Sequence, residues 1–221
     1  IREEMDSKKI QVEFVSANQT GPLHVGKGRG AIYGDVISKL LEKKGHEVQK
    51  EYYVNDAGRQ IDILTASVYL RAIDIEDNVF PESAYRGQYI KEIAKNANLQ
   101  EAINIDDLFK NLPEDEEKKI DKIISHLKSS SEKDWQSIKK MSLDNVLLTI
   151  EKDLEDFGVT FDNWFLESSL LGADSKIDAA VQQLNTNNLI DNRDGNIWFK
   201  SSDFGDDKDR VLIRADGRQT Y

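Results

Sequence analysis

A glycine-rich loop between a predicted strand and a predicted helix is the feature that most restricts how this chain can fold. IQVEFVSA at 10–17 alternates apolar and polar residues in a β-rich composition, as a strand does. After the loop, apolar residues recur at helical spacing from about 26 to 44, and Gly45 follows as a helix stop. HEVQKEYYVND and AGRQIDILTASVYLRA then predict another strand and helix. Residues 10–73 therefore predict a parallel β-α-β-α unit of the doubly wound α/β kind.

After about residue 74 the alternation of strands and helices stops. Apolar spacing predicts helices without intervening strands at about 83–96, 115–140, 142–157 and 175–187. PEDEEKKIDKIISHLKSSSEKDW keeps one apolar stripe on a heavily charged helix, which is typical of a solvated helix face. Asp194-Gly195 and Asp216-Gly217 lie between short β-rich runs and predict antiparallel hairpins. We therefore expect an α/β part at 1–73, a mostly helical segment at 74–194 and a hairpin return at 195–221.

Composition excludes several classes of protein. The chain has 30 Lys and Arg against 41 Asp and Glu, and the net charge of −11 argues against a protein that coats nucleic acids. It has no Cys, which removes disulfides and thiolate chemistry. No apolar run approaches membrane-spanning length and no secretory signal heads the chain, so we expect a cytoplasmic protein without a membrane partner. Its ends, IREEM and GRQTY, resemble those of an excised piece.

The glycine loop fits two phosphate-binding patterns. From Gly21 it reads G-P-L-H-V-G-K-G, which follows the P-loop up to the last position. A P-loop needs Ser or Thr there to hold Mg²⁺, and Gly28 has no side chain. P-loop domains also continue as β-α units, whereas this chain turns helical. A P-loop nucleotide hydrolase, with Asp56 as its metal-binding acid, is therefore the alternative hypothesis.

The competing pattern starts at His24. An imidazole beside glycines at the start of a helix can donate hydrogen bonds to phosphate oxygens, and Gly26 leaves room for a nucleotide to approach the backbone. Fixed donors of this kind stabilise the charge that develops when an α-phosphate is attacked. For His46 and His126 we expect only packing or surface roles.

Stretches spread along the chain resemble the arginyl-tRNA synthetases, a family of class I aminoacyl-tRNA synthetases. HVGK at 24–27 is similar to the His-Ile-Gly-His signature of that class and departs from it at Lys27. Six further stretches are similar to the arginine family and follow its order: VEFVSAN, TGPLHVG, EYYVNDAGRQ, YRGQYI, FDNWFLESSL and WFKSSDFGDDKDRVLIRADGRQTY. The resemblance implies a partial Rossmann-like catalytic domain, with residues 74–194 as a mostly helical connective insertion and terminal β-hairpins.

The resemblance also implies a reaction and its participants. The carboxylate of L-arginine attacks the α-phosphate of ATP, with Mg²⁺ accompanying the ATP, and the arginyl group then passes to tRNA(Arg). It assigns catalysis to His24 and Lys27, ATP binding to Gly21, His24, Gly26, Lys27 and Gly28, and arginine binding to Glu13, Ser16, Asn18 and Tyr221. The full-length protein is expected to be a monomer, and this chain, as a piece of it, to be inactive alone.

The chemistry of the side chains suits these roles. A guanidinium prefers carboxylate partners in planar, charge-assisted hydrogen bonds, which Glu13 can supply, and Asn18 adds an amide oxygen. Without the resemblance, Glu13 is a solvent-facing residue of a strand. Lys27 can neutralise phosphate charge, and Asp56 is expected to cap the second helix rather than to bind a ligand. A folded module that only binds tRNA or partners is the remaining, non-enzymatic interpretation.

Overall fold

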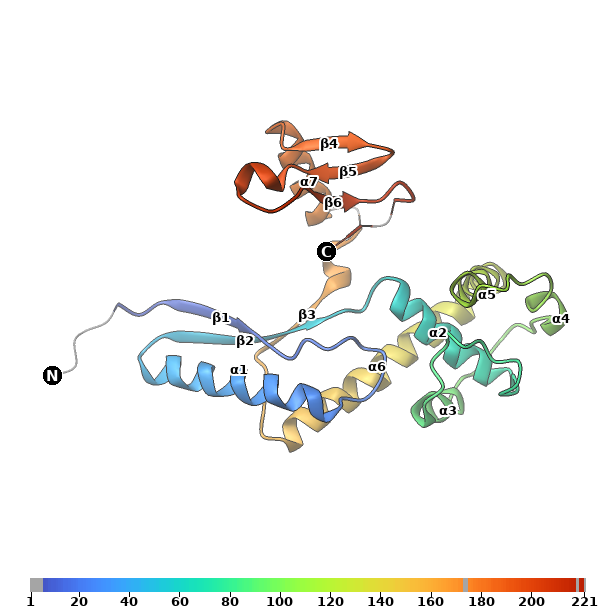
Figure 1. Ribbon diagram of the computed structural model, residues 1–221. Helices are drawn as coiled ribbons and strands as arrows, with labels where there is room; N and C mark the ends of the chain where they lie inside the picture. Colours follow the sequence, from blue (N-terminus) through green and yellow to red (C-terminus); the bar gives the residue numbers. More distant parts are fainter. Residues whose placement is uncertain (1–5, 173–174, 218, 221) are drawn as a thin grey trace. The chain divides into compact units, whose positions relative to one another are not determined.

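The computed structural model describes residues 6–172, 175–217 and 219–220. The chain divides into two compact units, residues 1–168 and 169–221, and Figure 1 follows their helices and strands along the sequence. Every candidate site residue that the structure describes belongs to the first unit. The first unit is therefore the one that positions the site.

The first unit is built on a parallel three-stranded sheet in the order β1-β2-β3. Its strands are β1 (Lys9–Glu13), β2 (Glu47–Val54) and β3 (Asn163–Leu166). Helix α1 (Val25–Lys43) makes the crossover from β1 to β2, which confirms the predicted β-α-β unit. The expectation of no strand between residue 74 and the hairpins was wrong, because β3 is only four residues long and too short to show alternation.

Small residues form the side of α1 that packs on the sheet. Gly34 and Ser38 are buried, and a Cβ at Gly34 would lie 2.1 Å from the Phe14 ring. The helix can approach the end of β1 because this position has no side chain. Val36 and Leu40, part of the apolar stripe that predicted the helix, are 47% and 59% exposed. The apolar spacing thus located the helix but not its packed face.

Helix α2 (Arg59–Ala72) is the centre of the helical part of the first unit, with α3, α5 and α6 packed against it. The other helices there are α3 (Gln88–Ala94), α4 (Ile105–Leu108), α5 (Glu116–Ser130) and α6 (Glu132–Asp156). The predicted break near residue 141 is wrong, since α5 ends and α6 begins around Ser131. The Ser131 side chain caps α6 by accepting a hydrogen bond from the Asp134 amide at 3.2 Å.

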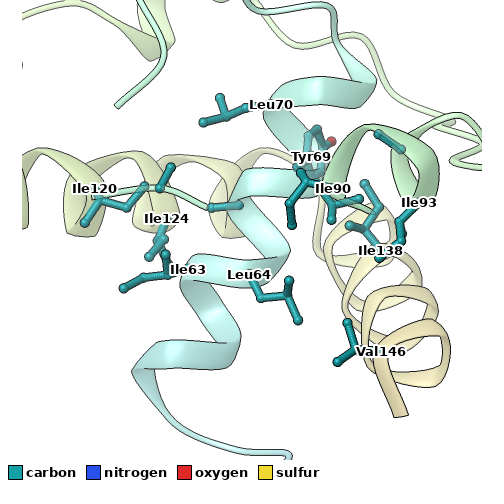
Figure 2. Close-up of a cluster of buried hydrophobic side chains, with 14 of the residues drawn as sticks. Ile63, Leu64, Tyr69, Leu70, Ile90, Ile93, Ile120, Ile124, Ile138 and Val146 are labelled. Atoms are coloured by element: carbon teal, nitrogen blue, oxygen red, sulfur yellow. The ribbon is translucent and has the colours of Figure 1, made fainter. Parts of the chain in front are cut away.

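The hydrophobic core of the first unit lies between these helices. Figure 2 shows side chains that gather there from four helices: Ile63, Leu64, Tyr69 and Leu70 of α2, Ile90 and Ile93 of α3, Ile120 and Ile124 of α5, and Ile138 and Val146 of α6. Each is at most 6% exposed. Helix α5 buries only its apolar stripe, as its charge pattern predicted.

The second unit contains α7 (Lys176–Thr186) and an antiparallel sheet in the order β4-β5-β6. Its strands are β4 (Ile190–Arg193), β5 (Asn196–Phe199) and β6 (Arg210–Ile213), and a short 3₁₀ helix spans Ser201–Phe204. Another short 3₁₀ helix, Glu167–Leu170, crosses the boundary between the two units in the sequence. Asp194 and Gly195 turn the first hairpin with φ values of 50° and 76°, both positive as a type I′ turn requires. The predicted β4–β5 hairpin is confirmed. In the described part of the chain, no helix is long and apolar enough to cross a membrane.

Leu64→Ala should lower the free energy of unfolding by about 2–5 kcal/mol, because Leu64 is fully buried and its truncation leaves a cavity. Urea unfolding followed by circular dichroism measures the change. Leu148→Ala on α6, where the side chain is 64% exposed, is the control and should have little effect. Equal effects of the two substitutions would contradict the position of the core.

Candidate functional site

The connection between β1 and α1 holds most of the candidate residues, and its backbone is strained. Val15 and Ser16 have φ values of 65° and 36°, which are unfavourable for residues with side chains and most of all for a β-branched one. Hydrogen bonds hold this shape. The Ser16 amide donates to the Phe14 carbonyl at 2.9 Å, and the Tyr52 hydroxyl accepts from the Ala17 amide at 3.0 Å and donates to the Ala17 carbonyl at 3.2 Å. Backbone strain of this kind concentrates at functional sites.

His24 is the N-cap of α1, and its ring has a defined orientation. Nδ1 accepts a hydrogen bond from the Gly26 amide at 3.1 Å, as an N-cap side chain does. A neutral imidazole whose Nδ1 accepts carries its proton on Nε2. Because the residue is exposed, Nε2 can donate a hydrogen bond to a ligand oxygen.

Two of the three glycines assigned to ATP binding have packing roles. A Cβ at Gly26 would lie 2.8 Å from Cε1 of His24, so the ring could not cap the helix in its present position. A Cβ at Gly21 would lie 3.0 Å from the Tyr89 ring. Gly28 is less constrained, since the nearest atom to its Cβ would belong to Phe157 at 3.9 Å. Gly26 therefore supports the orientation of His24 independently of any ligand.

The start of α1 carries an excess of positive charge. Lys27 lies in the first turn, which contains no acid, and Arg29 follows. Lys27 forms no ion pair with the described residues. Helices α2, α5, α6 and α7 each have an acid in the first turn, which is the arrangement that the helix dipole favours. A lysine at the positive end of a helix is unfavourable until an anion binds there.

His24 and Lys27 border a cavity of about 230 Å³ at the start of α1 and the end of α6. The other lining residues are Leu23, Val25, Gly28, Ala31, Asp153, Leu154 and Phe157. Phe157 is 53% exposed and gives the cavity an aromatic edge. This arrangement can hold a phosphate group beside Lys27 and an apolar ring beside Phe157.

The arginine-site candidates that the structure describes lie at the carboxyl end of β1. Glu13 is the last residue of the strand and is exposed. Asn18 is also exposed, and its Oδ1 accepts a hydrogen bond from Nδ2 of Asn55 at 3.3 Å. The Ser16 hydroxyl accepts from a backbone amide of β2 at 3.1 Å, so it helps to hold the loop. Tyr221 lies outside the described residues.

Glu51 is a candidate that the sequence analysis missed. It lies opposite Glu13 in the β1–β2 register and is 9% exposed. Gln11 and Asn163, from the strands on either side, donate amide hydrogen bonds to its two carboxylate oxygens. A second carboxylate beside Glu13 suits a cationic ligand. Only the strand register reveals this neighbour, because 38 positions separate the two residues in the sequence.

Asp56 joins the carboxyl ends of β2 and β3. Its carboxylate accepts hydrogen bonds from the amide of Ser168 at 2.8 Å and from its hydroxyl at 2.5 Å. The expectation that Asp56 caps α2 was wrong, because the N-cap is Gly58, which has a φ of 82°. Burial, and after it the charge of Asp56, raises the pKa of Glu167. These groups lie at the sheet end where ligands of parallel sheets bind.

The P-loop alternative is not favoured by this geometry. Asp56, its proposed metal-binding acid, is engaged by Ser168. Gly28 offers no oxygen at the position where a P-loop has its hydroxyl. Within the described residues, no three His, Cys, Asp or Glu side chains are grouped so that they could hold a metal ion.

The fold and the loop are those of a class I aminoacyl-tRNA synthetase catalytic domain. The family described as "tRNA synthetases class I (R), catalytic domain" matches residues 2–221, and the chain belongs to this family. Among curated relatives, the arginine–tRNA ligase of Acinetobacter baumannii (strain AYE) is 44% identical over 97% of the chain, and that of Psychrobacter cryohalolentis is 42% identical over 100%. The chain spans about 40% of the length of either relative.

Solved structures agree with this family. A Campylobacter jejuni protein assigned as an arginyl-tRNA synthetase has a TM-score of 0.73 at 34% identity, over 99% of this chain and 43% of that one. The arginyl-tRNA synthetase of Thermus thermophilus has a TM-score of 0.63 at 20% identity, over 98% of this chain and 34% of that one, and so shares the fold. The family resemblance inferred from the sequence is confirmed.

Gly26→Ala and Gly30→Ala distinguish the contribution of the His24 cap to stability from the contribution of helix propensity. A Cβ at Gly30 would meet no atom within 4 Å, so Gly30→Ala should raise the free energy of unfolding by roughly 0.5–1 kcal/mol. Gly26→Ala should be less stable than Gly30→Ala by about 1 kcal/mol, because its Cβ displaces the His24 ring from the cap. Urea unfolding of both variants measures the difference. Equal stabilities would mean that the cap contributes nothing.

Proposed function

We propose that this chain supplies part of the active site of an enzyme that ligates L-arginine to tRNA(Arg) and uses ATP. The observation that carries the proposal is the start of α1, where a capping His24 can offer Nε2–H and where Lys27, which borders a cavity, forms no ion pair within the described part of the chain. Both features suit a bound phosphate chain. Membership of the arginine family, together with relatives named arginine–tRNA ligase, supports the choice of substrates.

The first chemical step is attack by a carboxylate oxygen of arginine on the α-phosphorus of ATP. A phosphorus–oxygen bond forms, the bond from that phosphorus to its bridging oxygen breaks, and pyrophosphate leaves with the electron pair. The product is arginyl-adenylate. Negative charge grows on the phosphate oxygens during the step, and His24 and Lys27 supply donors to it, with the backbone at Gly21, Gly26 and Gly28 beside them. Donors that are already in place stabilise such charge without reorganisation.

The arginine side chain is bound, in this proposal, at the carboxyl end of β1. Glu13 pairs with the guanidinium, and Glu51 opposite it adds to the negative potential. Asn18, held by Asn55, offers a further acceptor. Ser16 keeps the loop in position, and the assignment of Tyr221 rests on the family resemblance alone.

In the second step a terminal ribose hydroxyl of tRNA(Arg) attacks the carbonyl carbon of the adenylate. The ester bond forms and the hydroxyl proton passes to the solvent, while the bond from the carbonyl carbon to the phosphate oxygen breaks and AMP leaves with its electron pair. Mg²⁺ enters as the ion that accompanies ATP, which it binds mainly through phosphate oxygens. We place the enzyme in the cytoplasm and expect a monomer at full length. Because the chain spans about 40% of its relatives, we expect no charging of tRNA by this chain alone.

Calorimetric titration of the chain with a nonhydrolysable arginyl-adenylate analogue tests the binding part of the proposal. The arginyl analogue should bind in preference to the lysyl analogue, because a planar guanidinium and a compact ammonium make different hydrogen bonds. Titrations with ATP and GTP, each with Mg²⁺, are run in parallel. Binding of the triphosphates alone would instead support a P-loop site. Activity is tested in a chimera in which the chain replaces the matching part of the Acinetobacter ligase, and failure to arginylate tRNA(Arg) would refute the function.

His24→Asn separates the catalytic role of Nε2 from the cap. Asparagine is also a good N-cap, but it cannot place a donor where Nε2 lies. In the chimera kcat/KM for ATP should fall roughly 100- to 1000-fold, while the free energy of unfolding changes by less than about 0.5 kcal/mol. His126→Asn is the control and should leave the rate unchanged. An unaltered rate in His24→Asn would remove His24 from the mechanism.

A further inference from the structure

Tyr89 of α3 contacts the glycine loop from a distant part of the sequence. Its hydroxyl donates a hydrogen bond to the carbonyl of Thr20, four residues before His24. Burial, and after it the neighbouring Tyr85, raises the pKa of Tyr89 to about 12. The hydroxyl is therefore protonated at neutral pH and remains a donor.

Glycines on both sides of this contact make room for the Tyr89 ring. A Cβ at Gly21 would lie 3.0 Å from both Cζ and the hydroxyl oxygen of Tyr89, and a Cβ at Gly87 would lie 2.3 Å from Cε1. Contacts below 3.0 Å force a displacement, and contacts at 3.0 Å force the neighbour to give way. Position 21, which the sequence assigned to ATP binding, must therefore be glycine to leave room for the Tyr89 ring. The YRGQYI stretch supplies both Gly87 and Tyr89.

Helix α3 is itself anchored to the core. Ile90 and Ile93 are 0% and 6% exposed and lie among the core side chains in Figure 2. Just before the helix, the Tyr85 amide donates to the Ser67 hydroxyl of α2 at 2.9 Å. The Tyr89 ring therefore projects from a well-packed helix. The loop that it contacts is tied to the helical core through Tyr89 as well as to the sheet.

We infer that Tyr89 is a positioning residue, which holds the loop at Thr20 and Gly21 so that His24 stands where the nucleotide phosphates bind. The hydroxyl fixes the backbone of the loop, and the ring fixes its distance from α3. The part of this inference that concerns ATP rests on the proposed function. The part that concerns the loop stands on the contacts alone.

Tyr89→Phe removes the hydroxyl and keeps the ring. Hydrogen exchange of the backbone amides at 17–24 should become roughly two- to tenfold faster, the range expected for loss of one hydrogen bond. Tyr69→Phe is the matched control, because Tyr69 is fully buried on α2 and its hydroxyl has no hydrogen-bond partner among the described residues. It should leave exchange in the loop unchanged.

A double-mutant cycle tests the ring contact separately. Gly21→Ala should accelerate exchange of the loop in the unaltered chain, because the new Cβ presses on the ring. In the Tyr89→Ala background the same substitution should have little further effect, since the ring is absent. Additive effects of Gly21→Ala and Tyr89→Ala would overturn the contact between the two residues.

ATP titration distinguishes this inference from the proposed function. In the chimera, Tyr89→Phe should weaken ATP binding by a factor similar to its effect on hydrogen exchange, and Tyr69→Phe should leave ATP binding unchanged. If the chimera fails to bind ATP but the loop of the chain responds to Tyr89→Phe, the proposed function fails and the contact between Tyr89 and the loop still stands. If Tyr89→Phe exchanges like Tyr69→Phe, the positioning role is wrong, whatever the ATP titration shows.

Discussion

The buried side chain of Tyr52 joins the parts on which the first unit depends. Its ring stacks on Trp164 with centroids 4.5 Å apart and meets Phe161 edge-on, which links β2 to β3 and to the turn before it. Its hydroxyl makes two hydrogen bonds to Ala17 in the loop after β1. Burial raises the pKa of this hydroxyl to about 12, so it remains a donor in neutral solution. One residue of β2 thus connects this strand to β3 and to the first half of the loop after β1.

The second half of the loop is held by the helical part of the first unit. It leads into the positively charged start of α1. Tyr89 reaches Thr20, and His24 closes the loop as the cap of α1. The loop is therefore held in shape by contacts within the chain, whereas the Lys27 side chain, at the positive end of the helix, forms no ion pair with any described residue. A loop whose backbone is already held in place, followed by a lysine without an ion pair at the start of a helix, is the arrangement expected of an anion-binding site. It differs from the acidic first turns of the long helices elsewhere in the chain.

Much of the architecture could be read from local patterns. The strand, loop and helix around His24, the buried stripe of α5 and the β4–β5 turn at Asp194 and Gly195 all depend on neighbouring residues, and all were predicted correctly. The errors arose where local signals were short or ambiguous. Strand β3 has four residues and takes its place only by pairing with β2. The break around Ser131 lay within a continuous apolar stripe, so its position depended on a single capping hydroxyl.

The sequence by itself determined the family and the identity of the loop, because His24, the glycines and Lys27 lie close together in the chain and the similar stretches follow in order. Tertiary structure alone decided how these residues are used. It showed that Gly21 and Gly26 accommodate side chains, that Asp56 joins two strands rather than capping α2, and that Glu51 stands beside Glu13. The physical reason is distance. Each of these contacts except that of Gly26 joins residues separated by 38 or more positions, and periodicity and spacing report only on near neighbours.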